Sequence, residues 1–188
     1  MTSDRAALHR DAIVIDATCP LLQDKSRIDL YRQGGITALC PTVGAVEGAA
    51  QTFRNVAGWL AHIRNDDGLL LVRRAADIEE AKRSGRIGII IHFQGADPIE
   101  DELDLLDGYH AMGLRMFQLA YNVKNRVGDG CDERTDAGLS RFGVALVRRL
   151  EALRIVVDCS HTGYRTTMDA IEMATRPIVF SHSNPRTV

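Results

Sequence analysis

The chain has 188 residues, which is enough for one sizeable hydrophobic core and too few for two. Its formal net charge of −2 and hydrophobic content of 45% are ordinary for a globular protein, and they give no reason to expect nucleic acid or an anionic membrane as a partner. The four cysteines are widely spaced without a C-x-x-C pair, which argues against a zinc finger or a disulfide framework.

The N-terminal segment and the hydropathy of the chain predict a soluble, cytoplasmic protein. The first residues, MTSDRAALHRD, are polar and charged and lack the apolar stretch of a signal peptide. No run approaches the ~20 apolar residues that are needed to cross a bilayer.

Six short apolar runs predict the strands of a parallel sheet. Their nearly continuous apolar character is typical of strands that are covered on both faces. The runs lie at residues 12–17, 36–43, 87–95, 114–121, 154–161 and 177–183.

Amphipathic segments between these runs predict helices. Apolar residues recur at three- and four-residue steps over 53–63 and 139–153, and Ser140 is a candidate N-cap for the second helix. Residues 100–113 open with acids, which favour a helix N-terminus, and end on Gly113, a candidate C-cap.

The alternation of strands and helices predicts an α/β fold with right-handed crossovers. An open doubly wound sheet and a (β/α)8 barrel both fit this order, but the chain has neither a G-x-G-x-x-G after the first strand nor a P-loop. Six strands in 188 residues match the spacing of a barrel of ~250 residues. We therefore predict a single TIM-barrel-like domain over residues 1–188, with about six of the eight strand–helix units.

An incomplete barrel has a physical consequence. About six parallel strands cannot close an eight-stranded barrel, so the edges near the first and sixth strands should stay unpaired. We expect such a shortened chain to aggregate or to complete itself as a homo-oligomer.

Polar side chains gather at the carboxyl ends of the predicted strands, where α/β folds place their active groups. His161 and His182 end consecutive strands, and adjacent strands lie ~4.8 Å apart, so both imidazoles could reach one metal ion. Imidazole suits zinc. Metal binding is favoured over the alternative that both histidines bond loop backbone at the rim. Asp158, on the other face by parity, is expected to fix a loop or support a ligand.

Several stretches resemble the renal (membrane) dipeptidases, zinc enzymes whose barrel fold is related to the amidohydrolases. The segment HFQGADPI sits where that family has its E-G segment, and the resemblance covers most of the chain from about residue 87 onward. The matching stretches are GLRMFQLAYNVKN (113–125), DAGLSRFGVALVRRLEALRIVVDCSH (136–161) and PIVFSHSNPRTV (177–188).

The resemblance implies a metal-dependent dipeptidase. His161 and His182 match the two histidines that bind the second zinc of the family's pair. In such a site two metals hold a bridging hydroxide that attacks the peptide carbonyl. Tyr121 corresponds to the histidine that assists the oxyanion and could still donate a hydrogen bond, and Asn122 is expected to contact the substrate. Arg186 matches a position that is often basic.

The sequence also departs from the family's pattern. Where the family has a His-x-Asp pair that binds the first zinc, this chain has Thr18 and Pro20. Gln94 stands at the position of the carboxylate that bridges both metals, and a neutral amide bridges two cations poorly. Gln94 is therefore expected to hydrogen-bond the substrate or a loop.

These departures imply at most one zinc ion, held by His161 and His182 with help from Gln94, Cys19 or solvent. Our leading interpretation is a shortened, divergent dipeptidase relative that hydrolyses a dipeptide or a similar small amide. Two alternatives stay open. One is a non-catalytic binding or structural relative that has lost the metal pair. The other is a single-zinc amidohydrolase acting on a non-peptide amide or lactone.

Overall fold

The computed structural model describes residues 2–184, with side chains from residue 4 onward. The α-helices are α1 (Thr2–Asp11), α2 (Ile28–Gln33), α3 (Ala49–Arg64), α4 (Ala75–Ser84), α5 (Leu105–Met112), α6 (Arg141–Ala152) and α7 (Tyr164–Met173). The 3-10 helices are η1 (Pro20–Gln23), η2 (Lys25–Arg27) and η3 (Asp97–Ile99). The strands are β1 (Ile15–Asp16), β2 (Ala38–Leu39), β3 (Thr42–Gly44), β4 (Leu69–Leu71), β5 (Ile87–Ile89), β6 (Ile91–Phe93), β7 (Leu114–Gln118) and β8 (Val156–Asp158).

All pairings between these strands are parallel, which confirms the predicted α/β class. They form two ladders, in the orders β1-β2-β5-β4 and β3-β6-β7-β8. The two ladders are joined along the chain, because two of the predicted strands are each broken into two shorter strands. The predicted strand 36–43 corresponds to β2 and β3, and the predicted strand 87–95 corresponds to β5 and β6. Pro41 separates the first two, since proline has no N–H to donate to a ladder.

Two strand predictions need correction. Leu69–Leu71 forms β4 beside β5 although no strand was predicted there, because a three-residue run gives too little pattern to separate it from a loop. Residues 177–183 make only an isolated bridge between Val179 and Asp158. This segment begins with Pro177 and pairs on one side only among the described residues, so it does not extend into a ladder.

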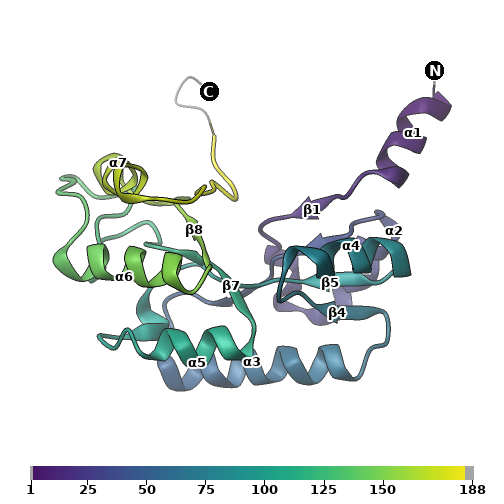
Figure 1. Ribbon diagram of the computed structural model, residues 1–188, viewed down its shortest axis with the longest axis horizontal. Helices are drawn as coiled ribbons and strands as arrows, with labels where there is room; N and C mark the ends of the chain where they lie inside the picture. The colour runs from purple at the N-terminus through teal and green to yellow at the C-terminus, as the bar shows by residue number, and fades with distance from the viewer. Residues whose placement is uncertain (1, 185–188) are drawn as a thin grey trace.

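Figure 1 shows α3 and α5 side by side beneath the sheet and α6 and α7 near β8, while α1 extends away from the rest of the chain. Core contacts join these layers. The Phe93 ring packs edge-on against Tyr109 of α5 at 4.8 Å between centroids, and Phe117 of β7 lies 6.0 Å from Phe93. The incomplete barrel is confirmed, because β1 ends one ladder, residues 177–183 lie beyond β8 at the end of the other, and neither pairs with a further strand within the part of the chain that is described. Self-association through those edges stays a prediction.

The predicted helix ends are confirmed at two of three places. The Ser140 hydroxyl accepts a hydrogen bond from the Gly143 N–H at 3.0 Å and caps α6, and Gly113 ends α5 in the left-handed conformation at φ 119°. The helix predicted from residue 100 begins only at Leu105. Glu100 itself has φ 51° and ψ −114°, which lies outside the helical region, so the helix does not begin there.

Replacing Ser140 by alanine should lower the free energy of unfolding by about 1 kcal/mol, because α6 loses its cap. The Ser140 hydroxyl also donates to the Arg126 carbonyl at 2.6 Å, so the loop before α6 loosens as well. Urea unfolding followed by the fluorescence of Trp59, the single tryptophan, measures the change. Ser84→Ala at the exposed end of α4 is the matched control; an equal loss in both variants would contradict the capping role.

Candidate active site

His161 and His182 meet at the carboxyl-terminal side of the strands. His161 follows β8 and has φ 61°, while His182 lies in the segment that bridges to β8. Their Nε2 atoms are 2.6 Å apart and both rings are partly buried. The structure therefore brings together the two histidines that the sequence analysis paired.

The partners of His161 fix its tautomer. Its Nδ1 lies 2.5 Å from the side-chain oxygen of Asn122, which can only accept a hydrogen bond. Nδ1 therefore carries the proton, and the Nε2 lone pair faces His182. Asn122, which we predicted to contact substrate, orients His161 in this structure, and the Tyr121 ring stacks on the imidazole at 4.5 Å between centroids.

The partners of His182 fix the same tautomer. Its Nδ1 lies 2.9 Å from the Thr18 hydroxyl and 2.7 Å from the Ser181 hydroxyl. Ser181 donates its proton to Asp158, so its oxygen accepts from the His182 Nδ1–H, while the Thr18 hydroxyl has the Ala17 carbonyl and the Ser181 oxygen as further partners. The His182 Nε2 lone pair is thus turned toward His161.

Two lone pairs that face each other at 2.6 Å repel unless a cation lies between them. A proton is disfavoured, because burial lowers the pKa of both imidazoles, and His182 lowers that of His161 further. Neutral imidazole is the form that ligates metal.

Asp158 holds the two strand ends that carry the histidines, the loop-fixing role expected of it. This buried carboxylate accepts from the N–H groups of Ser160 and Ser181 at 2.9 and 3.2 Å, and from the Ser181 hydroxyl. Burial alone would raise the pKa of Asp158. The neighbouring His92 ring, 3.4 Å away, and these hydrogen bonds outweigh burial and hold that pKa well below its ordinary value.

Gln94 reaches the histidine pair from the end of β6. Its side-chain oxygen accepts from the Thr42 hydroxyl at 2.7 Å, and its amide nitrogen lies 3.5 Å from His182 Nε2. The amide thus presents N–H groups to the site. Such an arrangement suits hydrogen bonding to a carbonyl better than the bridging of two cations.

Two imidazoles converge in this site, fewer than the three protein ligands of a typical catalytic zinc, and the residues beside them supply no donors for a second metal. Thr18, where the family has a metal ligand, instead supports His182, and Cys19 donates its S–H to the Asp16 carbonyl. Burial raises the pKa of the Cys19 thiol to about 12, so it stays protonated. Among residues 2–184 no group of three or more His, Cys, Asp and Glu side chains is placed to hold a metal. Arg186 lies outside the described residues.

Sequence reasoning did not find the partners of His182. Thr18 is separated from it by 164 positions, and a hydroxyl residue at a strand end gives no local signal for such a contact.

No helix among residues 2–184 combines the length and the apolar character that a bilayer crossing requires.

Comparisons with known proteins agree with this architecture. A family model described as membrane dipeptidase (peptidase family M19) matches residues 40–188. An amidohydrolase from Pseudomonas aeruginosa superposes with a TM-score of 0.90 at 36% identity, over 94% of this chain and 55% of that one. A metallo peptidase from Rhodobacter sphaeroides, solved with a phosphinate mimic of the dipeptide L-Ala-D-Ala, shares the fold with a TM-score of 0.80 at 20% identity, over 92% of this chain and 65% of that one.

A curated relative, the dipeptidase verJ from Clonostachys rogersoniana, is 29% identical over 127 residues, which is 66% of this chain and 33% of verJ. The chain thus spans less than two thirds of each of these three proteins.

Proposed function

Because the chain belongs to the membrane dipeptidase family (peptidase family M19), we propose that it is a metal-dependent hydrolase of dipeptides or similar small amides that uses one zinc ion. The observation that carries this proposal is the convergence of two Nε2 lone pairs, from His161 and His182, at 2.6 Å. Each ring is locked in the metal-binding tautomer by an outer partner, as histidine ligands of metal sites are.

Each residue of the site has a distinct task in the proposed reaction. His161 and His182 would hold the ion, oriented by Asn122 on one side and by Thr18 and Ser181 on the other. Zinc, when bound, supplies a Lewis acid and lowers the pKa of a coordinated water.

The remaining contacts concern the substrate. The Gln94 amide N–H groups face the histidine pair, so they can donate to the scissile carbonyl. Tyr121, which is 37% exposed beside His161, can donate its hydroxyl proton to the oxyanion that forms when the carbonyl is attacked. Attack of a water molecule on the carbonyl carbon forms the C–O bond of this tetrahedral species. Its collapse breaks the C–N bond, and the proton lost by the water is taken up by the departing nitrogen, so a carboxylic acid and an amine are released.

A second candidate is a single-zinc amidohydrolase that acts on a non-peptide amide or lactone. The neutral Gln94 fits this candidate and the first equally, because the side chain at the bridging position carries no charge to hold a second metal, so the substrate decides between them. A non-catalytic relative is the third candidate, and it follows if two imidazoles alone hold no ion.

Zinc content separates these candidates. We expect purified apoprotein to take up one equivalent of Zn²⁺ in a competition titration with a chromogenic chelator, and to cleave members of a dipeptide panel. Two equivalents would contradict the loss of the first metal position, and a content near zero would favour the non-catalytic relative. One equivalent with cleavage only of lactones or non-peptide amides would favour the second candidate.

A further inference from the structure

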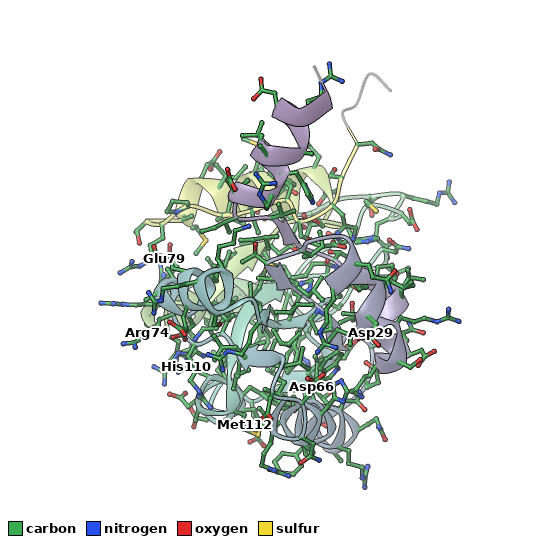
Figure 2. The ribbon with its side chains drawn as sticks, turned by 90° about the vertical axis from the view of Figure 1, so that its right-hand side faces the viewer. Asp29, Asp66, Arg74, Glu79, His110 and Met112 are labelled. Carbon is green, nitrogen blue, oxygen red and sulfur yellow. The ribbon has the colours of Figure 1, made fainter. Side chains whose placement is uncertain are left out.

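The buried carboxylate of Asp158 is joined to His182 through a single hydroxyl group. Charged side chains of this protein mostly point to solvent, as Arg74 and Glu79 do at the outer surface in Figure 2. Asp158 and the neighbouring His92 are instead fully buried. Because a buried charge is costly unless hydrogen bonds or an opposite charge compensate it, the partners of this carboxylate indicate its role.

The two carboxylate oxygens of Asp158 have separate partners. Oδ1 accepts from the backbone N–H groups of Ser160 and Ser181 at 2.9 and 3.2 Å. Oδ2 lies 2.5 Å from the Ser181 hydroxyl oxygen and 3.4 Å from His92 Nε2. An ionised carboxylate can only accept hydrogen bonds, so the Ser181 hydroxyl has to donate its proton to Oδ2.

His92 supports the ionised form of this carboxylate from the layer below. His92 is paired in register with Met116, and Asp158 with Gln118, so His92 and Asp158 face the same side of the sheet. Among residues 4–184 neither ring nitrogen of His92 has a hydrogen-bond partner, and the 3.4 Å contact with Asp158 is longer than an ordinary hydrogen bond. Burial has the largest influence on the pKa of Asp158 and raises it, while His92 contributes most among the contacts that lower it.

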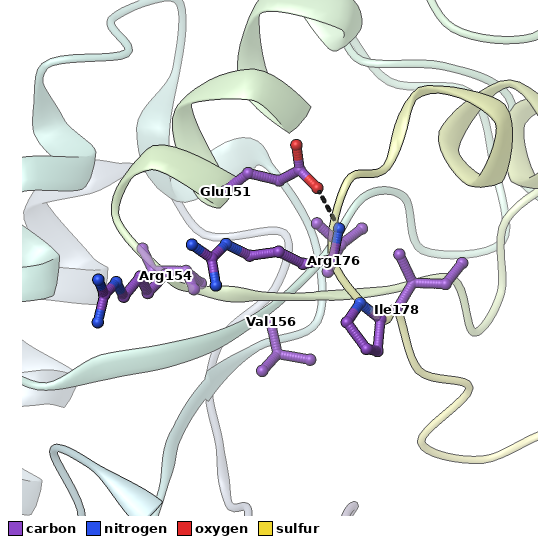
Figure 3. Close-up of a pocket in the computed structure, with 8 residues that line it drawn as sticks. Glu151, Arg154, Val156, Arg176 and Ile178 are labelled. Carbon is purple, nitrogen blue, oxygen red and sulfur yellow. Dashed lines mark hydrogen bonds between the residues drawn. The ribbon is translucent and has the colours of Figure 1, made fainter.

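The segment that carries Ser181 and His182 is held at two points. Where it begins, the Glu151 carboxylate accepts from the backbone N–H of Arg176 at 3.0 Å, the bond that is drawn in Figure 3. Further along, Asp158 accepts from the backbone N–H of Ser181. The second point places the Ser181 hydroxyl between the carboxylate and the imidazole, with its oxygen 2.7 Å from His182 Nδ1.

These contacts form a hydrogen-bond chain with a fixed direction. His182 Nδ1–H donates to the Ser181 oxygen, and the Ser181 hydroxyl donates to Asp158. If the group at the position of Asp158 were a donor, the Ser181 proton would turn toward His182 Nδ1, and the ring proton of His182 would belong on Nε2. His182 would then lose the Nε2 lone pair that faces His161 and that a metal ion requires.

We propose that Asp158 is a positioning residue of the histidine site, because its negative charge sets the direction of the Ser181 hydroxyl and thereby keeps the His182 Nε2 lone pair free for a metal ion. Carboxylates that hold a metal-ligating histidine in one tautomer are a common arrangement, and here a hydroxyl stands between the two groups. The inference rests on the proposed function, since it concerns the same histidine pair. The tautomer of His182 can nevertheless be measured without metal or substrate.

Asp158→Asn reverses the chain without changing the shape of the side chain. The amide oxygen belongs at the position of Oδ1, which faces two backbone N–H groups, so the NH2 group faces the Ser181 hydroxyl and the His92 ring. The Ser181 oxygen then accepts from the amide, and its proton turns to His182.

Nitrogen-15 NMR of the histidine rings reads the tautomer directly. The parent protein for this measurement is metal-free His161→Gly, in which no second imidazole faces His182 and in which glycine accommodates the φ of 61° at position 161. At about pH 8, well above the ordinary histidine pKa of ~6.5, His182 should be protonated at Nδ1 in this parent. Adding Asp158→Asn should move the proton to Nε2.

Asp129→Asn is the matched control. Asp129 is also a buried aspartate, but its carboxylate accepts from the Ala137 N–H at 2.7 Å and pairs with Lys124 at 3.1 Å. This substitution should leave the His182 tautomer unchanged. With both histidines present, Asp158→Asn should bind zinc about tenfold more weakly than the wild type, and Asp129→Asn should bind it with wild-type affinity.

Ser181→Ala removes the connecting hydroxyl at a partly exposed position. In this background Asp158→Asn should weaken zinc binding no further, because the two residues act through one chain of contacts. A proton that stays on His182 Nδ1 in Asp158→Asn, or a further tenfold weakening in the Ser181→Ala background, overturns the proposal. If circular dichroism shows Asp158→Asn to be unfolded, a His182 tautomer that Ser181→Ala leaves unchanged overturns it. The expected tautomers without any zinc binding would contradict the hydrolase proposal alone.

Discussion

Replacing His182 by alanine should abolish stoichiometric zinc binding and, with it, hydrolysis. The variant keeps one imidazole, and a single neutral ligand beside the Gln94 amide does not retain the ion. The loss should exceed the ~10–100-fold in metal affinity that follows from removing only an outer partner of a ligand. Competition titration with a chelator measures the affinity, and circular dichroism checks that the variant is folded.

His9→Ala is the matched control for that experiment. His9 is an exposed histidine on α1 that bonds the Gly34 carbonyl at 2.8 Å, so its loss removes an imidazole without touching the site. It should retain one equivalent of zinc. Full zinc binding by His182→Ala would show that the ion sits elsewhere and would end the assignment of the histidine pair.

Thr18→Ala tests the orientation of His182 separately from its ligation. Without the threonine hydroxyl, His182 Nδ1 keeps only Ser181 as an acceptor, so zinc affinity should fall by about tenfold while the stoichiometry stays near one. Isothermal titration measures both quantities. An unchanged affinity would mean that Ser181 alone suffices to set the tautomer.

The fold could be predicted from the sequence where its signals are local and repeated. Apolar runs found the strands that carry the site, and Ser140 and Gly113 marked helix ends because capping depends on neighbours within one turn. The three leucines of β4 were missed, since a strand this short is defined by its partner β5 and not by its own pattern. Residues 177–183 were predicted to form a strand but make only an isolated bridge at Val179, because an apolar run does not form a strand without a neighbouring strand to pair with.

The sequence predicted where the histidine pair lies, but it did not predict the hydrogen bonds that orient the two rings. The positions of His161 and His182 at the ends of consecutive predicted strands indicated that the two side chains lie close together, and the structure puts them in contact. The supporting bonds from Asn122 and Thr18 depend on backbone turns, among them the left-handed φ of 61° at Asn122, which no spacing rule encodes. The orientation of Gln94 is likewise set by Thr42, 52 positions away.

Loss of the buried Asp158 carboxylate should lower the free energy of unfolding. Asp158→Ala leaves the buried N–H of Ser160 and the partly buried N–H of Ser181 without their acceptor, and it removes the charge beside His92. Each hydrogen bond to a charged group contributes ~1.5–3 kcal/mol, and we expect a total loss of about 3 kcal/mol because the loops relax in part. Urea unfolding followed by Trp59 fluorescence measures it. Asp67→Ala, at an exposed loop position, should change stability by less than ~0.5 kcal/mol.

The pH dependence of the free energy of unfolding tests whether the negative charge of Asp158 causes the stabilisation. Since the pKa of Asp158 is depressed in the folded state, its contribution is fully present above the ordinary aspartate pKa of ~4 and is lost as pH falls through that value toward the folded pKa. On the order of 2 kcal/mol should therefore disappear from the wild type on acidification below about pH 5. In Asp158→Asn this part of the acid loss should be absent, so the two stability curves converge at low pH. Parallel curves would show that packing, rather than the buried carboxylate, holds the two strand ends together.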